Sequence, residues 1–159
     1  MYSQPMEQFE EATGWCMIEQ TPVAETILLV EDDAFVRTVT CEVLQSAGYR
    51  VLMAENSAQA ASIYEQRGGE VDLLLTDMIL PGETGLALAA SLRRQNSGLN
   101  ILLVTGYATQ KGLAELRPEE LLAKPFSTQA LLRRVRQLLG SPGLRTARHD
   151  SVTLACATA

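Results

Sequence analysis

Four short apolar runs, each closed by polar residues, constrain the fold of this chain more than any other feature. They span residues 27–30, 73–75, 101–104 and 121–123, and they are closed by Glu31-Asp32-Asp33, Thr76-Asp77, Thr105 and Lys124. Apolar runs of this length between turn signals are typical of buried strands. The carboxyl ends of parallel strands lie at one edge of a sheet. We therefore predict that these polar residues meet in one pocket.

Helical patterns separate the strands. We predict strands at residues 26–30, 49–54, 71–76, 101–104 and 121–123, with helices at about 35–47, 57–67, 85–94, 108–116 and 128–139. Asn56 or Ser57, Thr84 and Ser127 are the expected N-caps. Val36, Val39, Val43 and Ala47 share one face of the first helix. The alternation predicts an α/β fold, a flavodoxin-like doubly wound five-stranded parallel sheet, (βα)5.

Length and charge indicate one domain with two extensions. The chain has 159 residues, 47% of them hydrophobic, which is enough for one sizeable core. Five of the six net negative charges fall before Thr26, where there is no Lys or Arg. We expect a flexible acidic extension over residues 1–24, a domain over 25–140 and a flexible tail over 141–159. Without a basic patch, we expect no direct contact with nucleic acid.

The cysteines and the apolar pattern indicate a cytoplasmic protein. Cys16, Cys41 and Cys156 are odd in number and lack metal or redox spacing, which favours reduced thiols. We expect Cys41 to lie in the core of a helix. No apolar stretch approaches the roughly 18 residues of a membrane span, so we expect no membrane association.

The strand-end residues are suited to phosphoryl transfer. Asp77 closes a buried strand and is placed to act as a nucleophile. Carboxylates held close together repel one another unless a cation lies among them, and Mg²⁺ prefers such oxygen ligands. A lysine ammonium, here that of Lys124, can offset the negative charge of the phosphoryl oxygens, and a hydroxyl, here that of Thr105, can donate a hydrogen bond to one of them. The pattern predicts a magnesium-dependent phosphoryl acceptor.

Over residues 25–140 the sequence resembles the receiver domain of two-component response regulators. The resemblance is carried by four motifs in the right order: Leu28-Leu29-Val30-Glu31-Asp32-Asp33, Thr76-Asp77-Met78-Ile79-Leu80-Pro81-Gly82 with Gly85, Val104-Thr105-Gly106 and Ala123-Lys124-Pro125-Phe126. It implies that Asp77 accepts a phosphoryl group from a phosphohistidine. It also implies that Glu31, Asp32, Asp77 and the Ile79 carbonyl hold Mg²⁺, that Thr105 senses the phosphate and that Lys124 binds it.

Three further expectations follow from the same motifs. The Lys124-Pro125 bond is expected to be cis, as is usual in the family. Asp33 falls one position past the acidic pair and is interpreted as a helix N-terminal acid. The family's usual aromatic three residues before the lysine is replaced by Leu121, so the conventional aromatic switch is in question, and Tyr107 is a candidate replacement.

The lifetime of the phosphorylated state depends on the water that attacks the acyl phosphate. The side chains two positions after the acceptor and two after the threonine are best placed to orient or exclude it, and here they are Ile79 and Tyr107. Ile79 offers no hydrogen bond, and Tyr107 is a poor general base near neutral pH. We expect slow dephosphorylation.

Three functional interpretations remain open. The first is a stand-alone receiver, which accepts its phosphoryl group from a sensor histidine kinase or phosphotransfer protein and acts through a downstream protein, since only 19 residues follow Gly140. Such a protein turns over no external substrate. The second is the receiver end of a hybrid histidine kinase. The third is a haloacid-dehalogenase-like phosphatase, although Asp32-Asp33-Ala34 does not match the Asp-x-Asp nucleophile of that class.

Overall fold

The computed structural model describes residues 24–106 and 116–140. Five parallel strands form one sheet in the order β2-β1-β3-β4-β5. The strands are β1 (Thr26–Val30), β2 (Arg50–Ala54), β3 (Leu73–Asp77), β4 (Asn100–Thr105) and β5 (Leu121–Ala123). The predicted flavodoxin-like arrangement of the sheet is confirmed.

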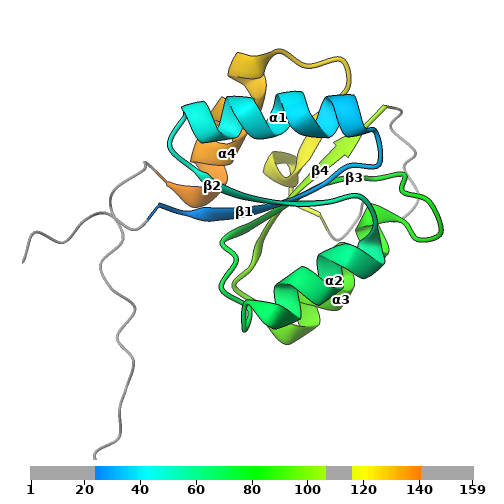
Figure 1. Cartoon of the computed structure of the whole chain (residues 1–159). Coiled ribbons are helices and arrows are strands. Elements are labelled where there is room, and N and C mark those ends of the chain that lie inside the picture. The colour runs from blue at the N-terminus through cyan, green and yellow to red at the C-terminus, as the bar shows by residue number, and fades with distance from the viewer. Residues whose placement is uncertain (1–23, 107–115, 141–159) are drawn as a thin grey trace, which may run out of the picture.

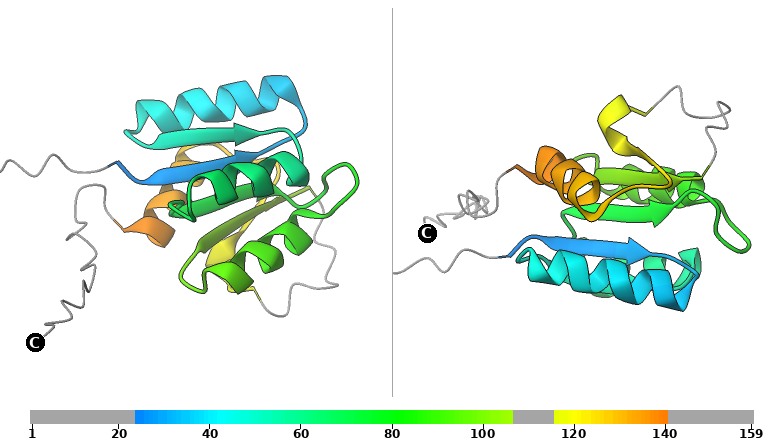
Figure 2. Two further views of the ribbon diagram at one scale, coloured as in Figure 1. Left: turned by 60° about the horizontal axis from the view of Figure 1, so that its bottom comes forward. Right: turned by 90° about the horizontal axis from the view of Figure 1, so that it is seen from above.

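Helices cover both faces of the sheet (Figures 1 and 2). They are α1 (Ala34–Ser46), α2 (Ser57–Gln66), α3 (Gly85–Gln95) and α4 (Thr128–Leu139), and a single 3₁₀ turn at Pro118–Glu120 leads into β5. Helices α1 and α4 pack on one face, and α2 and α3 pack on the other. The predicted helix at 108–116 falls almost wholly outside the described residues. In the described ranges, no helix is both long and apolar enough to cross a membrane.

Each α-helix begins at a side chain that caps it. Asp33 accepts hydrogen bonds from the amides of Phe35 and Val36, and Asn56, Thr84 and Ser127 each accept one from the first turn of their helix. These side chains satisfy amides that have no partner inside the helix. The predicted caps at Thr84 and Ser127 are confirmed, and Asn56 rather than Ser57 caps α2.

The core forms two layers, one on each side of the sheet. Alternate residues along each strand point to opposite faces, so Leu28 and Leu74 pack under α2 and α3, whereas Ile27, Leu73 and Leu75 pack under α1 and α4. The strands are buried on both faces, which explains their continuous apolar runs. This packing fixes the strand ends and thereby the edge that carries the polar residues.

The predicted apolar face of α1 is only partly buried, with Val43 and Ala47 packed against the core. Cys41 and Leu44 are the buried residues of the helix, which confirms Cys41 as a core residue, whereas the Val39 side chain is 42% exposed. Val39, Val43 and Ala47 also line an open groove beside α4, together with Thr128 and Leu132. The valines therefore lie on the flank of the helix, where the period of 3.6 residues places them when Cys41 and Leu44 point at the sheet.

Strand β3 begins two residues later than predicted, because Asp72 makes a different contact. The Asp72 carboxylate accepts a hydrogen bond from the Thr26 amide at 2.8 Å, and the Asp72 amide donates to the Thr26 carbonyl. These bonds tie the start of β1 to the segment before β3. The pairing of Ile27 with Leu73 follows directly.

Candidate functional site

The strand ends bring the predicted polar residues together at one edge of the sheet. Lys124, which follows β5, donates a hydrogen bond to Asp77 at the end of β3, with 2.5 Å between Nζ and Oδ2. The same ammonium lies 3.7 Å from Oε2 of Glu31, which follows β1. One cation therefore links two carboxylates that come from the ends of the neighbouring strands β1 and β3. Asp32 lies next to Glu31 on the exposed side of this cluster.

Thr105 and Lys124 are joined through the backbone. Thr105 is buried at the end of β4, where it pairs with Ala123. The Lys124 amide donates to the Thr105 carbonyl at 2.7 Å, and the Lys124-Pro125 bond is cis, as predicted. The strand end that carries the ammonium is thus hydrogen-bonded to the backbone of Thr105.

The segment after Asp77 folds back tightly on the acceptor strand. The Ile79 amide donates to Asp77 Oδ1 at 3.1 Å, while the Ile79 side chain is 75% exposed. The Gly85 amide donates to the Met78 carbonyl at 2.9 Å. A Cβ atom at Gly85 would lie 2.0 Å from the Asp77 carbonyl oxygen, so only glycine permits this close approach.

The charges of the cluster shift the pKa values of two of its members. Burial raises the pKa of Glu31, and the nearby charges of Asp77 and Asp32 raise it further against the opposing effects of the Asp33 amide and Lys124. Burial lowers the pKa of Lys124, but the hydrogen bond and charge of Asp77, with the charge of Glu31, outweigh burial and raise it overall. The ammonium therefore stays protonated, and the site holds crowded carboxylates around one cation.

The donor set suits a hard divalent cation. Carboxylates of Glu31, Asp32 and Asp77 and the carbonyl of Ile79 are the oxygen ligands that Mg²⁺ takes. As the described residues stand, no three acidic, histidine or cysteine side chains are close enough together to hold a metal ion. The Lys124 ammonium lies between two of the carboxylates, so loading of the metal requires these side chains to rearrange. The chemistry of the residues fits Mg²⁺, and the sequence prediction of a magnesium site remains a prediction.

Sequence reasoning did not single out two charged groups, one beside the site and one at the start of β5. Arg37 on α1 donates from Nη1 to the carbonyls of Glu31 and Asp32 at 2.5 and 3.3 Å. Glu120, which is fully buried just before β5, accepts hydrogen bonds from Arg93 at 2.5 Å and Arg117 at 3.0 Å. The position of Arg37, shortly after the acidic cluster, is a weak sequence signal for a contact with that turn. The sequence carries no such signal for Glu120, because its partner Arg93 lies 27 positions away. Tyr107 lies outside the described residues.

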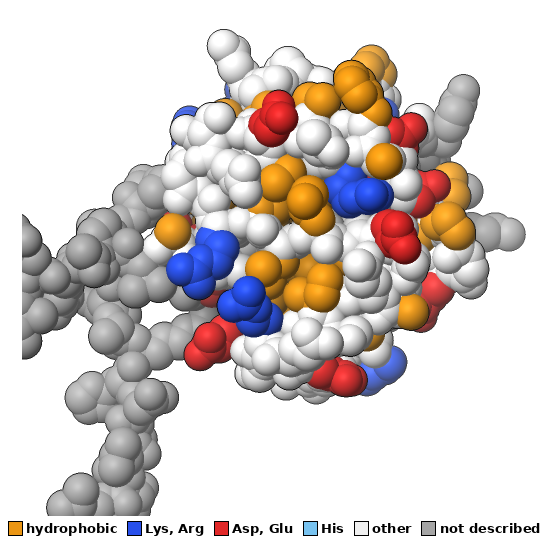
Figure 3. Space-filling view, viewed as in Figure 1, with side chains coloured by type: hydrophobic (Ala, Val, Ile, Leu, Met, Phe, Trp, Pro, Cys, Tyr) orange, Lys and Arg blue, Asp and Glu red, His pale blue; other side chains and the backbone are white. Residues whose placement is uncertain are grey.

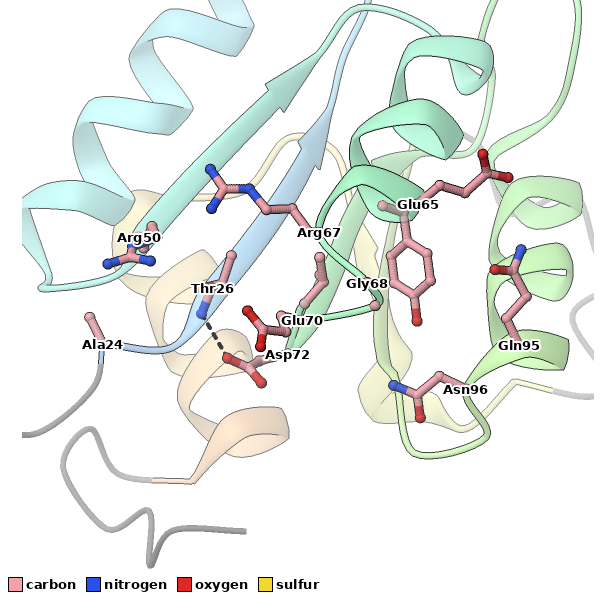
Figure 4. Close-up of a pocket in the computed structure, with 13 residues that line it drawn as sticks. Ala24, Thr26, Arg50, Glu65, Arg67, Gly68, Glu70, Asp72, Gln95 and Asn96 are labelled. Carbon is pink, nitrogen blue, oxygen red and sulfur yellow. Dashed lines mark hydrogen bonds between the residues drawn. The ribbon is translucent and has the colours of Figure 1, made fainter. Parts of the chain in front are cut away.

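A second hollow lies at the opposite edge of the sheet (Figure 4). It has a volume of about 810 Å³ and is lined by side chains of both charges, among them Arg50, Arg67, Glu70 and Asp72. The hydrogen bond between Thr26 and Asp72 crosses its floor. None of the predicted site residues lines this hollow, so the candidate site is the smaller crevice at the carboxyl edge, around Glu31, Asp77 and Lys124.

The sheet order and the helices on both of its faces define the class of flavodoxin-like doubly wound proteins, here with an acidic crevice and a lysine at the carboxyl edge. The family model of the response regulator receiver domain matches residues 27–136. The chain belongs to the response regulator receiver domain family.

Known proteins of several kinds resemble the chain. It is 36% identical to the sensor kinase CckA of Brucella abortus over 117 residues, which are 72% of this chain and 12% of that protein. It is 35% identical to the phosphate regulon transcriptional regulatory protein PhoB of Pseudomonas aeruginosa over 127 residues, 76% of this chain and 54% of that one. The chain thus spans about half or less of these two relatives.

Solved structures agree with the fold. The receiver domain of the hybrid histidine kinase CckA is 34% identical, with a TM-score of 0.61 over 72% of this chain and 98% of that one. The response regulator TrrA of Thermotoga maritima, solved in complex with Mg²⁺ and BeF, is 29% identical with a TM-score of 0.61 over 72% of this chain and 99% of that one.

Proposed function

We propose that Asp77 accepts a phosphoryl group from a phosphohistidine of a sensor histidine kinase or phosphotransfer protein. The contact of Lys124 with Asp77 and Glu31 carries the proposal, because it places a cation where phosphoryl oxygens would lie. In the reaction a carboxylate oxygen of Asp77 attacks phosphorus, a P–O bond forms, and the P–N bond breaks with its electron pair kept by the histidine. Later attack of water on phosphorus breaks the bond to the Asp77 oxygen, releases inorganic phosphate and restores the carboxylate. No external substrate is turned over.

Each residue of the crevice has a defined part in this step. The Lys124 ammonium moves from the carboxylate to a phosphoryl oxygen, and the Thr105 hydroxyl hydrogen-bonds to another. Mg²⁺, held by Glu31, Asp32, Asp77 and the Ile79 carbonyl, would neutralise the phosphoryl oxygens when bound. The TrrA structure, which holds Mg²⁺ and BeF, supports this assignment by family.

Exposed apolar residues favour a helical donor. Phe35 is 77% exposed at the start of α1, beside the acidic cluster, and Val39 follows one turn later on the same side. Val39 then leads into the groove between α1 and α4. A partner helix that carries the phosphohistidine can pack on this stripe while its histidine reaches Asp77.

We propose that the output is a protein contact in the cytoplasm, made by a stand-alone receiver. Basic and acidic side chains are interspersed with apolar ones on the face shown in Figure 3, which gives no support for nucleic-acid binding there. The receiver end of a hybrid kinase is the second candidate, because CckA is among the relatives.

Phosphorylation with acetyl phosphate and Mg²⁺ tests the assignment of the acceptor. The wild-type chain should gain the mass of one phosphoryl group, and Asp77→Asn should gain none. Asp33→Asn is the matched control, because asparagine also caps a helix and the substitution removes one nearby carboxylate; it should be labelled like the wild type. Labelling that persists in Asp77→Asn would show that another residue is the acceptor.

A further inference from the structure

The turn between β1 and α1 contains only Glu31, Asp32 and Asp33, and its two ends are fixed. The Glu31 amide donates to the Ala54 carbonyl of β2 at 3.1 Å. Asp33 caps α1, and its own amide donates to Glu31 Oε1 at 3.2 Å. The middle residue, Asp32, is exposed. The Asp33 amide belongs to the peptide plane after the Asp32 Cα atom, so its bond to Glu31 holds that plane, whereas neither end bond holds the plane before Asp32.

Arg37 contacts the peptide plane before Asp32 and adds a second contact to the plane after it. Its Nη1 donates to the Glu31 carbonyl at 2.5 Å and to the Asp32 carbonyl at 3.3 Å. These carbonyls belong to the peptide planes before and after the Asp32 Cα atom. The direction of a side chain depends on the two peptide planes that flank it, since they set φ and ψ. The guanidinium, together with the bond from the Asp33 amide, therefore restricts the direction in which the Asp32 carboxylate projects.

We propose that Arg37 is a positioning residue that holds Asp32 ready to bind Mg²⁺. The inference rests on the proposed magnesium site and adds a residue outside the ligand set. Partners that orient metal ligands from outside typically contribute 10- to 100-fold to metal affinity. Within the described residues the hydrogen bonds of Arg37 go to backbone carbonyls, so we expect it to act through the shape of the turn and not through contact with the ion.

The direction in which Mg²⁺ affinity changes when Arg37 is replaced separates a positioning role from a purely electrostatic one. A cation near the site repels Mg²⁺, so removal of its charge by itself strengthens metal binding. Loss of the two hydrogen bonds frees the peptide planes and weakens metal binding. Weaker Mg²⁺ binding in Arg37→Gln would therefore reflect the lost orientation of the turn around Asp32. Arg37→Lys keeps the charge, but its ammonium ends one bond short of the arginine nitrogen, so it should also bind weakly.

Calorimetric titration of the full chain with Mg²⁺ tests the proposal. We expect Arg37→Gln and Arg37→Lys to lower Mg²⁺ affinity about tenfold. The control Arg133→Gln removes an exposed charge from α4 and should stay within about twofold of the wild type. At saturating Mg²⁺, labelling by acetyl phosphate should return to nearly the wild-type rate in both Arg37 variants, which a damaged fold would not allow.

Three outcomes would overturn the proposal: unchanged affinity in both variants, tighter binding in Arg37→Gln, or wild-type affinity in Arg37→Lys. If Arg37→Gln shows no cooperative thermal unfolding transition and is therefore not folded, the Mg²⁺ affinity of Arg37→Lys alone tests the proposal. A wild-type chain that binds no Mg²⁺ and accepts no phosphate would overturn the proposed function itself. If the wild-type chain binds Mg²⁺ and is labelled, but the Arg37 variants keep the wild-type Mg²⁺ affinity, only the role of Arg37 would be overturned.

Discussion

Lys124 balances the charge of the crevice. Its ammonium lies 2.5 Å from Asp77 and 3.7 Å from Glu31, and this attraction offsets part of the repulsion between the carboxylates. Burial and the neighbouring carboxylates still raise the pKa of Glu31. Binding of the proposed Mg²⁺ would relieve the repulsion that remains.

Glu31→Gln should stabilise the metal-free chain near neutral pH. The folded-state pKa of Glu31 is raised, chiefly by burial, so the stability it contributes is present below its unfolded pKa of about 4.3 and is lost as pH rises through the folded value. Removal of the charge should therefore add about 1 kcal/mol at pH 7 and little at pH 4. Thermal unfolding in EDTA at the two pH values measures this difference.

Glu42→Gln is the control for that experiment, because Glu42 is exposed on α1. It should change stability by less than about 0.5 kcal/mol at either pH. A loss of stability at pH 7 in Glu31→Gln would show that the ion pair with Lys124 outweighs burial and repulsion.

The lifetime of the phosphorylated state should depend on Ile79 and Tyr107. The Ile79 side chain is 75% exposed beside Asp77, where it can exclude water but cannot orient it. Ile79→Asn with Tyr107→Glu should speed loss of the phosphoryl group about tenfold, because polar groups then position the attacking water. Decay of labelled protein after removal of acetyl phosphate measures the rate. Equal or slower decay in the double variant would show that these side chains do not control the water.

At the scale of the elements, local sequence predicted most of what is seen. The first and last strands begin and end where the apolar runs predicted, and the capping residues mark the helix starts because a cap acts on its own first turn. The buried face of α1 could not be predicted in the same way. Two apolar faces exist on that helix, and its packing against the sheet and α4 selects Cys41 and Leu44 over Val39.

The buried ion cluster before β5 should contribute strongly to stability. Burial raises the pKa of Glu120, but its bonds with Arg93 and Arg117 outweigh burial and lower the pKa overall. A lowered pKa means that the stability is present above the unfolded pKa of about 4.3 and is lost as pH falls through the folded value. Glu120→Gln should lower the free energy of unfolding by about 2 kcal/mol at pH 7. The free energy of unfolding should also fall less steeply as the pH is lowered.

Glu119→Gln is the matched control for Glu120→Gln. The Glu119 side chain is 40% exposed and lies 3.6 Å from Arg117, so its loss should cost less than about 0.5 kcal/mol. Urea unfolding from pH 3 to 7 compares the two variants. Equal effects at both positions would show that burial of Glu120 adds nothing to the ion pair.

At the scale of the whole molecule, topology determines which residues meet. Asp77, Thr105 and Lys124 are 28 and 19 positions apart, and the sequence could place them together because parallel strands end at one edge. Arg37 and Glu120 could not be placed in this way. Their partners are carbonyls of a turn and arginines from α3 and the segment before β5, whose positions depend on the finished packing.

The domain should be contained in residues 24–140. In the part of the chain that the structure describes, both core layers and the five strands of the sheet lie within this range. A fragment of residues 24–140 should therefore unfold cooperatively, with a free energy of unfolding within about 1 kcal/mol of the full chain. It should also accept one phosphoryl group from acetyl phosphate, because Glu31, Asp77, Thr105 and Lys124 are all present. Limited proteolysis of the full chain should yield a core with nearly these ends, and a fragment that fails to fold or to be labelled would show that an extension belongs to the domain.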